Sequence, residues 1–230
     1  MNRNLSYALL AAAVLWFVMF SPQTAGNVDF RGAMASSAAM LLILSLWYGR
    51  DLWRIRWQKW QSSGNKTLYV LKQISLGISI AAALWGVFWI GDKVSLWLFP
   101  SFALLQVDAV YGLKDNASPQ HIGWLLLCLI GSAEEIFWRG YVQAAFFRMF
   151  RTDPPRWLRR LPARWAAMIV TTAVYTLIHI PAMNFMLLMS AFVCGLVWGG
   201  LYAWRRDWLP AVILSHALWE TAVFVWFPIM

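Results

Sequence analysis

Residues 122–148 read IGWLLLCLIGSAEEIFWRGYVQAAFFR, an almost unbroken apolar run. A run of this length can cross the hydrocarbon core of a membrane, which takes about 20 residues of helix. Three charged side chains, Glu134, Glu135 and Arg139, nevertheless lie inside it. Glu134 is about 18 Å along the helix from Ile122, at about 1.5 Å per residue. A charged group at such a depth costs about 2.5–3.5 kcal/mol on insertion scales, so its presence there indicates a function.

The rest of the chain has the same apolar character. Of its 230 residues, 61% are hydrophobic and 13% are charged, whereas about 25% are charged in soluble domains. The runs are continuous and do not alternate, which argues against a membrane β-barrel. The sequence therefore predicts an all-α integral membrane protein, a bundle of about seven transmembrane helices. The runs are residues 7–20, 33–48, 70–91, 122–148, 165–180, 183–204 and 209–228.

The formal charge of +9 comes from basic residues in short segments between these runs. The positive-inside rule predicts this distribution for a membrane protein, so the charge does not indicate nucleic-acid binding. If the spans alternate, most of the basic residues fall on one side of the membrane, and only Arg31, Lys93 and Lys114 fall on the other. We therefore expect a multi-pass protein of the cell membrane with a cytoplasmic N-terminus and an external C-terminus. The first group is Arg3, Arg50, Arg54, Arg56, Lys59, Lys66, Lys72, Arg148, Arg151, Arg156, Arg159, Arg160, Arg164, Arg205 and Arg206.

We expect two regions, residues 1–120 and residues 121–230, with the chemistry in the second. In the first region, Arg50–Lys66 interleaves tryptophans with basic residues, as an interfacial amphipathic helix does. Residues 91–120 mix apolar and polar side chains, so they either dip into the membrane or lie on its surface. The first run is compatible both with an uncleaved span and with a cleaved signal peptide.

Helical geometry separates the two adjacent glutamates. Glu135 and Arg139 are four residues apart and share a helix face, so we expect an ion pair between them. Glu134 lies about 100° round the same helix and points elsewhere. A purely structural Glu–Arg pair would leave this second carboxylate unexplained.

Two more spans contribute polar groups. His179 ends the fifth run, and His216 lies in the seventh run on the same helix face as Glu220. A single histidine inside a membrane often serves only as a hydrogen bond between helices. Two histidines on separate spans, in a chain with three intramembrane carboxylates, favour a shared site instead.

These motifs resemble those of the CPBP family, the CAAX-processing and bacteriocin-processing (Abi) glutamate-type intramembrane endopeptidases. The resemblance rests on Glu134-Glu135-x-x-x-Arg139, on an aromatic-x-x-x-His segment ending at His179, and on His216-x-x-x-Glu220. It covers residues 122–227 and places the catalytic core in the last four spans. The chain departs from the family pattern at Tyr175, where phenylalanine is usual, and at Glu220, where asparagine or aspartate is usual.

The resemblance implies a peptidase that needs no metal and no cofactor. Glu134 would activate a water molecule that His179 helps to position, and Arg139 would hold Glu135. His216, with Glu220 beside it, would stabilise the oxyanion, unless Glu220 only orients His216. The implied partners are the lipid bilayer and a membrane-associated peptide or protein substrate, with no nucleic acid. Water has to reach the site, so we expect a polar cavity that opens to the cytoplasm.

Other interpretations of the same residues remain open. Glu134, His179, His216 and Glu220 include enough ligands for a catalytic zinc ion, although no His-Glu-x-x-His motif is present. Neither Ser132 nor Ser215 lies in a Gly-x-Ser-x-Gly motif, which disfavours a serine protease. A transporter or a non-enzymatic scaffold is a third alternative. The sequence does not select a substrate or an oligomeric state.

Overall fold

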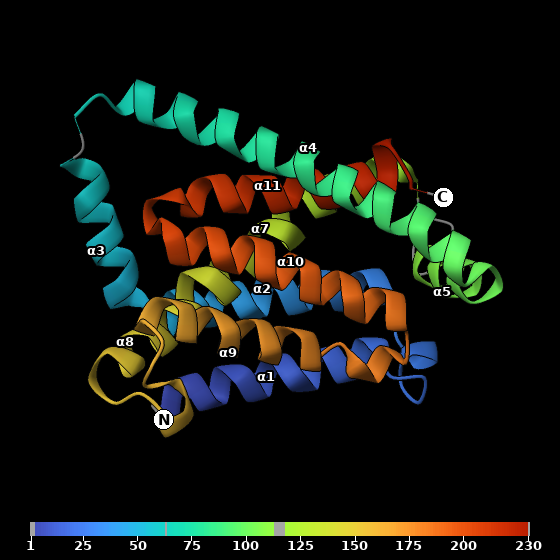
Figure 1. Ribbon diagram of the computed structural model, residues 1–230, viewed down its shortest axis with the longest axis horizontal. Helices are drawn as coiled ribbons and strands as arrows, with labels where there is room; N and C mark the ends of the chain where they lie inside the picture. The colour runs from blue at the N-terminus through green and yellow to red at the C-terminus, as the bar shows by residue number, and fades with distance from the viewer. Residues whose placement is uncertain (1–2, 63, 113–117, 230) are drawn as a thin grey trace.

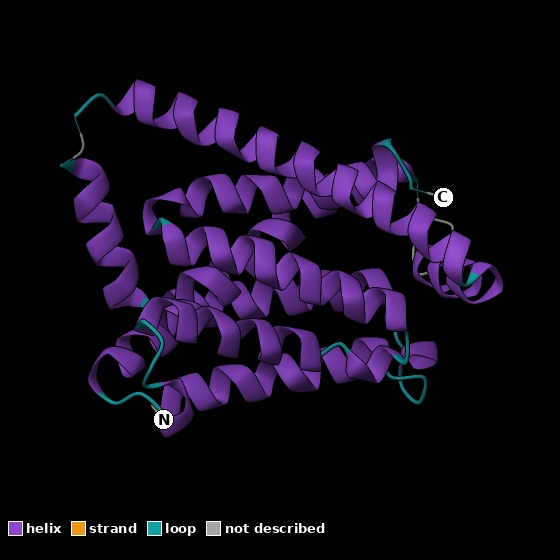
Figure 2. Cartoon of the chain, viewed as in Figure 1, coloured by secondary structure: helices purple, strands orange, loops and turns teal. Residues whose placement is uncertain are grey.

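The protein is described by a computed structural model that covers residues 3–62, 64–112 and 118–229. In this part of the chain every regular element is a helix (Figure 2). Seven helical segments are long and apolar enough to cross a membrane, which confirms the predicted fold class and the number of spans. They are Arg3–Phe20, Phe30–Tyr48, Lys66–Leu98, Pro119–Thr152, Ala163–Ala182, Phe185–Trp204 and Arg206–Trp226.

The described residues up to Gly112 form three spans, two further α-helices and one short 3-10 helix. Side-chain caps fix where α2 and α4 begin, because Asp29 accepts a hydrogen bond from the Gly32 amide and Asn65 accepts one from the Leu68 amide. The segment expected to form an interfacial helix is α3. The mixed segment from residue 91 forms the end of α4 and then α5. Lys114 lies outside the described residues. The elements are α1 (Arg3–Phe20), η1 (Ala25–Asn27), α2 (Phe30–Tyr48), α3 (Arg50–Gln61), α4 (Lys66–Leu98) and α5 (Pro100–Gly112).

The fourth span is not a uniform α-helix. It begins behind a Ser118 cap with Pro119 in the first turn and then passes through two π-helical segments, which flank Glu134 and Glu135. Wider π-turns of this kind occur often at functional sites and were not predicted from the sequence. The elements are α6 (Pro119–Leu125), η2 (Leu126–Ile130), α7 (Gly131–Glu135), η3 (Ile136–Gln143) and α8 (Ala144–Thr152).

Three spans complete the bundle. The fifth ends in a short 3-10 turn, after which Met183 takes a left-handed conformation (φ 49°) and Asn184 caps the next helix. The seventh span ends in a third π-helical segment, which begins directly after Thr221. The elements are η4 (Arg156–Leu158), α9 (Ala163–Leu177), η5 (Ile180–Ala182), α10 (Phe185–Trp204), η6 (Arg206–Trp208), α11 (Leu209–Thr221) and η7 (Ala222–Trp226).

The two ends of the bundle differ in charge. In Figure 1 the N-terminus, α3 and α8 lie at one end, and α5 and the C-terminus lie at the other. The first end carries Arg3, α3, residues 148–164 and residues 205–206, and we call it the basic end. The second end, formed by residues 21–29, α5 and residues 182–185, is called the α5 end.

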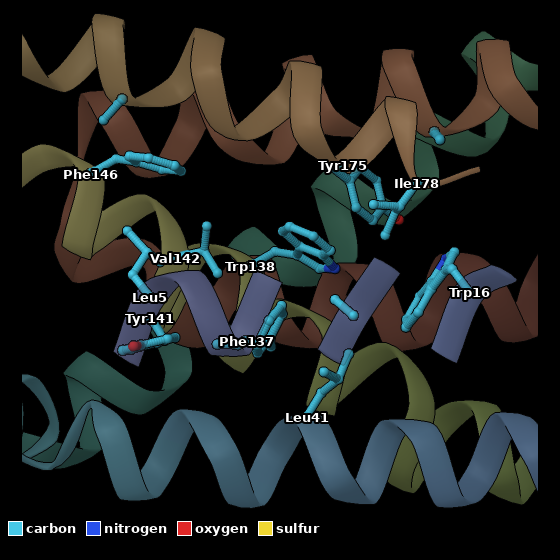
Figure 3. Packing of buried hydrophobic residues seen from close by; sticks show 14 of the residues in the cluster. Leu5, Trp16, Leu41, Phe137, Trp138, Tyr141, Val142, Phe146, Tyr175 and Ile178 are labelled. Carbon is cyan, nitrogen blue, oxygen red and sulfur yellow. The ribbon is translucent and has the colours of Figure 1, made fainter. Parts of the chain in front are cut away.

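The outer surface of the bundle is apolar, unlike that of a soluble protein. Outward-facing apolar side chains are exposed, among them Leu10, Ile43 and Trp97, as expected where lipid replaces water. One large cluster fills the space between α1, α2, the fourth span and α9, and Phe137 and Trp138 lie in it with no exposed surface (Figure 3). The polar groups singled out in the sequence lie inside the bundle as well, which is the usual place for intramembrane charges.

Candidate functional site

The two adjacent glutamates have different surroundings. Glu134 lines the main cavity, and its Oε2 accepts a hydrogen bond of 3.2 Å from the Tyr175 hydroxyl. Glu135 is fully buried, lies outside the cavity lining, and accepts a hydrogen bond of 2.6 Å from Arg139 Nη1. The predicted ion pair between Glu135 and Arg139 is therefore confirmed, and so is the separate direction of Glu134.

Arg139 is held on several sides. Its guanidinium lies over the Tyr175 ring at 5.0 Å and over the Trp198 ring at 5.6 Å, distances at which a cation is attracted to an aromatic face. Nη2 also donates to the Cys194 carbonyl at 3.4 Å. The cation is thus a fixed part of the site, and it reaches α9 and α10 as well as its own helix.

His216 is placed by Glu135 and Trp198. Its Nδ1 lies 2.8 Å from Glu135 Oε1, and its ring stacks on Trp198 at 3.9 Å with 23° between the planes. Because Glu135 already accepts from Arg139, the Glu135 carboxylate is an acceptor and Nδ1 of His216 carries the proton. His216 also lines the cavity, and among the described residues its Nε2 has no hydrogen-bond partner.

A small residue lets α7 and α11 approach each other closely. A Cβ atom on Gly131 would lie 2.9 Å from both Cα and N of Ala217 in α11, which is closer than real Cβ contacts. Gly131 begins α7, the turn that carries Glu134 and Glu135, and Ala217 follows His216. The missing side chain at residue 131 therefore allows Glu135 to reach His216.

His179 has both ring nitrogens occupied. Its Nε2 lies 3.0 Å from Trp16 Nε1, which donates, so Nδ1 carries the proton and donates to the Tyr175 carbonyl at 2.7 Å. The first span thus reaches the site through Trp16. This contact could not be predicted from the sequence, because Trp16 resembles the other tryptophans of the apolar runs.

Glu220 lies in α11, one turn beyond His216. It is 6% exposed and lines the cavity. Its Oε2 is buried and has no hydrogen-bond partner within the described residues. Buried carboxyl groups are normally paired, so an unpaired one that faces a cavity suggests contact with a ligand.

The cavity brings Glu134, His179, His216 and Glu220 together. Its volume is about 800 Å³, and most of its lining is apolar. It extends from these residues towards the α5 end, where α5 and the first turns of α10 line it. The expectation of a polar cavity that opens to the cytoplasm was wrong in its polarity, because most of the lining is apolar. The lining also lies away from the basic segments, which we expect on the cytoplasmic side.

The described residues contain no group of three or more His, Cys, Asp or Glu side chains arranged to hold a metal ion. The four residues proposed as zinc ligands line one cavity without converging on a point. Ser215 accepts a hydrogen bond from Trp198 Nε1 at 2.8 Å and donates to the Val212 carbonyl, so its hydroxyl supports the packing of α10 on α11.

Comparison with known protein families gives a match in the C-terminal part of the chain. Residues 117–222 match the family model of the type II CAAX prenyl endopeptidase Rce1-like proteins, which is consistent with the CPBP family. The matched segment contains Glu134, Glu135, Arg139, His179, His216 and Glu220. No curated protein and no solved structure gives a significant match. The match supports a membrane endopeptidase of the CAAX type.

Proposed function

We propose that this chain, with its Rce1-like domain at residues 117–222, hydrolyses a peptide bond of a membrane-associated substrate with Glu134 as the general base. The observation that carries the proposal is that the two adjacent glutamates have different surroundings. Glu134 faces the cavity, whereas Glu135 is bound by Arg139 and His216. Glu134 is therefore the carboxylate of this pair that a substrate and a water molecule in the cavity would meet.

The reaction needs no covalent intermediate. Glu134 takes a proton from a water molecule while the water oxygen bonds to the carbonyl carbon of the substrate. The carbonyl oxygen becomes an oxyanion. When the C–N bond breaks, the proton held by Glu134 passes to the leaving nitrogen, which restores the carboxylate. General-base catalysis of this kind contributes roughly 10²–10⁴-fold to a rate.

His216 is suited to stabilise the oxyanion. Nδ1 of His216 donates to Glu135. The ring lines the cavity, and among the described residues its Nε2 has no hydrogen-bond partner. A histidine donates from both nitrogens only as an imidazolium, so the Glu135 carboxylate supports the form that the oxyanion requires. Removal of one such donor typically costs about 10²–10³-fold in rate.

His179 and Tyr175 orient the base. The Tyr175 hydroxyl donates to Glu134, and His179 donates to the Tyr175 carbonyl while it accepts from Trp16. With both nitrogens engaged, His179 would bind a water molecule only if Trp16 moved away. We therefore assign His179 first to the support of Tyr175, and its expected contact with water stays a prediction.

The test is the substitution Glu134→Gln, which keeps the shape of the side chain and removes the base. We expect peptide cleavage to fall by at least roughly 10²-fold, measured with the purified protein on a quenched fluorescent peptide that ends in a prenylated cysteine motif. A second readout is the set of new protein termini in membranes of cells that express the wild type or the Glu134→Gln chain.

The matched control for this experiment is Tyr175→Phe, which removes the hydrogen bond to Glu134 and keeps the carboxylate. It should reduce cleavage less than Glu134→Gln does. Equal cleavage by wild type and Glu134→Gln, or new termini that do not depend on Glu134, would refute the glutamate mechanism.

Glu220 is proposed as a second polar contact for the substrate or the oxyanion. If it acts as a hydrogen-bond donor, Glu220→Gln should retain clearly more activity than Glu220→Ala, because the amide still donates. Loss of one oxyanion donor predicts a decrease of about 10²-fold for the alanine variant. Equal rates for Glu220→Ala and the wild type would show that the carboxyl group takes no part.

A further inference from the structure

The lining of the cavity comes from one half of each span. Among the described residues, the segments 35–86, 135–174 and 199–215 contribute no lining side chain. These segments contain α3 and the connections around residues 152–163 and 205–207, which form the basic end. The lining comes instead from residues 16–34, 87–111, 122–134 and 175–198, from the last turns of α11 and η7, and from Ile229.

Several lining residues near the α5 end are much more exposed than those at the site. Glu134 and His216 are 6% and 3% exposed, whereas Phe99 and Phe185, which line the same cavity, are 62% and 52% exposed. Arg31 and Asp92 also line this outer part. The cavity is therefore closed towards the basic end and widens towards the α5 end.

The charge distribution gives the bundle a direction in the membrane. Basic residues in short connections stay on the cytoplasmic side. In the described part of the chain they gather at the basic end, and only Arg31 and Lys93 lie at the α5 end. The basic end is thus the cytoplasmic one, and the α5 end faces the opposite side of the membrane.

We propose that the cavity receives its substrate from the non-cytoplasmic side of the membrane. The substrates are then membrane-anchored peptides or proteins whose cleaved segment is exported, and an apolar part of the substrate fills the outer cavity. This inference rests on the function proposed above for its catalytic part, but the direction of the cavity stands on lining, exposure and charge alone.

The direction is tested by labelling single cysteines in intact cells with a maleimide that does not cross membranes. The full chain is used with both native cysteines replaced, since Cys128 is exposed and Cys194 is buried. Ser95→Cys lies in the cavity lining, Ser101→Cys lies exposed on α5, and Thr152→Cys lies exposed at the basic end. Permeabilised cells give the total labelling of each variant.

We expect intact cells to label Ser101→Cys and Ser95→Cys to most of the permeabilised level and Thr152→Cys several-fold less. Labelling of Thr152→Cys but not Ser101→Cys in intact cells would overturn the orientation. Labelling of Ser101→Cys without Ser95→Cys would overturn the open cavity. None of these outcomes depends on peptide cleavage.

The substrate class is tested by mapping the new termini that appear with wild type and not with Glu134→Gln. These termini should lie on the non-cytoplasmic side of the spans of their parent proteins. Termini on the cytoplasmic side would refute this inference and leave the glutamate mechanism intact. If no termini depended on Glu134, the proposed function would fail while the labelling result still fixed the direction of the cavity.

Discussion

At the scale of single residues, the site separates a buried ionic framework from the groups that face the cavity. Glu135 and Arg139 form the framework, and His216 joins it through Nδ1. Glu134 and Glu220 lie at the cavity wall. Replacements in the framework should therefore change stability as well as activity, whereas replacements at the wall should change activity alone.

The first prediction concerns Glu135→Gln. This substitution leaves the buried Arg139 without its anionic partner, and loss of one member of a buried ion pair costs about 3–5 kcal/mol. We expect a clearly lower midpoint of thermal unfolding in detergent than for Glu134→Gln, which does not touch the pair. Equal midpoints for the two variants would contradict the assignment of Glu135 to the framework.

The second prediction concerns Trp16→Phe, which keeps an aromatic ring beside His179 and removes the N–H group that donates to Nε2. Loss of this hydrogen bond should cost about 1 kcal/mol of stability. Because His179 then keeps only its hydrogen bond to the Tyr175 carbonyl and is oriented less firmly, kcat should fall more than KM rises. Trp16→His, which again offers an N–H group, should restore part of the rate. An unchanged kcat of Trp16→Phe with a lower unfolding midpoint would show that Trp16 serves only in packing.

At the scale of helices, the close contact of α7 with α11 and the π-helical segments set the relative positions of the polar groups. The π-helical segments lie directly before α7 and directly after Glu135, and a third follows α11. Arg56 of α3 donates to the Gly140 carbonyl at 2.8 Å, so the interfacial helix is attached to the second of these segments. The helix that carries the glutamates is thus attached to α3 on its C-terminal flank.

The third prediction tests the α7–α11 contact. Gly131→Ala would place a methyl group against the backbone of Ala217, so α11 has to shift and His216 moves away from Glu135. We expect a loss of both activity and stability, measured by cleavage rate and unfolding midpoint. Gly86→Ala in α4 is the matched control: a Cβ atom there meets nothing within 4 Å, and alanine favours a helix by about 1 kcal/mol. If the two variants behaved alike, the close approach would not matter.

The sequence predicted the helices better than their mutual arrangement. Span positions follow from apolar length, and the Glu135–Arg139 pair follows from helical spacing, so both are local properties. The contact of Trp16 with His179 joins residues of the first and fifth spans, and no local pattern encodes it. The π-helical segments also escaped prediction, since they depend on packing and not on residue type alone.

At the scale of the whole molecule, the side of the cavity was the main error. The charge pattern predicts which end is cytoplasmic, and the need for water predicts an opening at that same end. In the structure the wide part of the cavity lies at the α5 end. There α4 ends at Leu98 and α5 turns towards α10. The Gln106 backbone carbonyl of α5 accepts a hydrogen bond of 2.8 Å from the side-chain amide of Asn184. Such a path depends on tertiary packing.

The fourth prediction tests whether this cavity is the route of the substrate. Gly91 lines its outer part, and a Cβ atom there meets nothing within 4 Å. Gly91→Leu should therefore fold normally and narrow the route, which raises KM for a membrane-anchored peptide while the unfolding midpoint stays close to that of the wild type. Gly86→Leu is the matched control, because Gly86 lies on the same helix with equal space but outside the lining. An unchanged KM for Gly91→Leu, or an equal rise for both variants, would show that the substrate reaches Glu134 by another path.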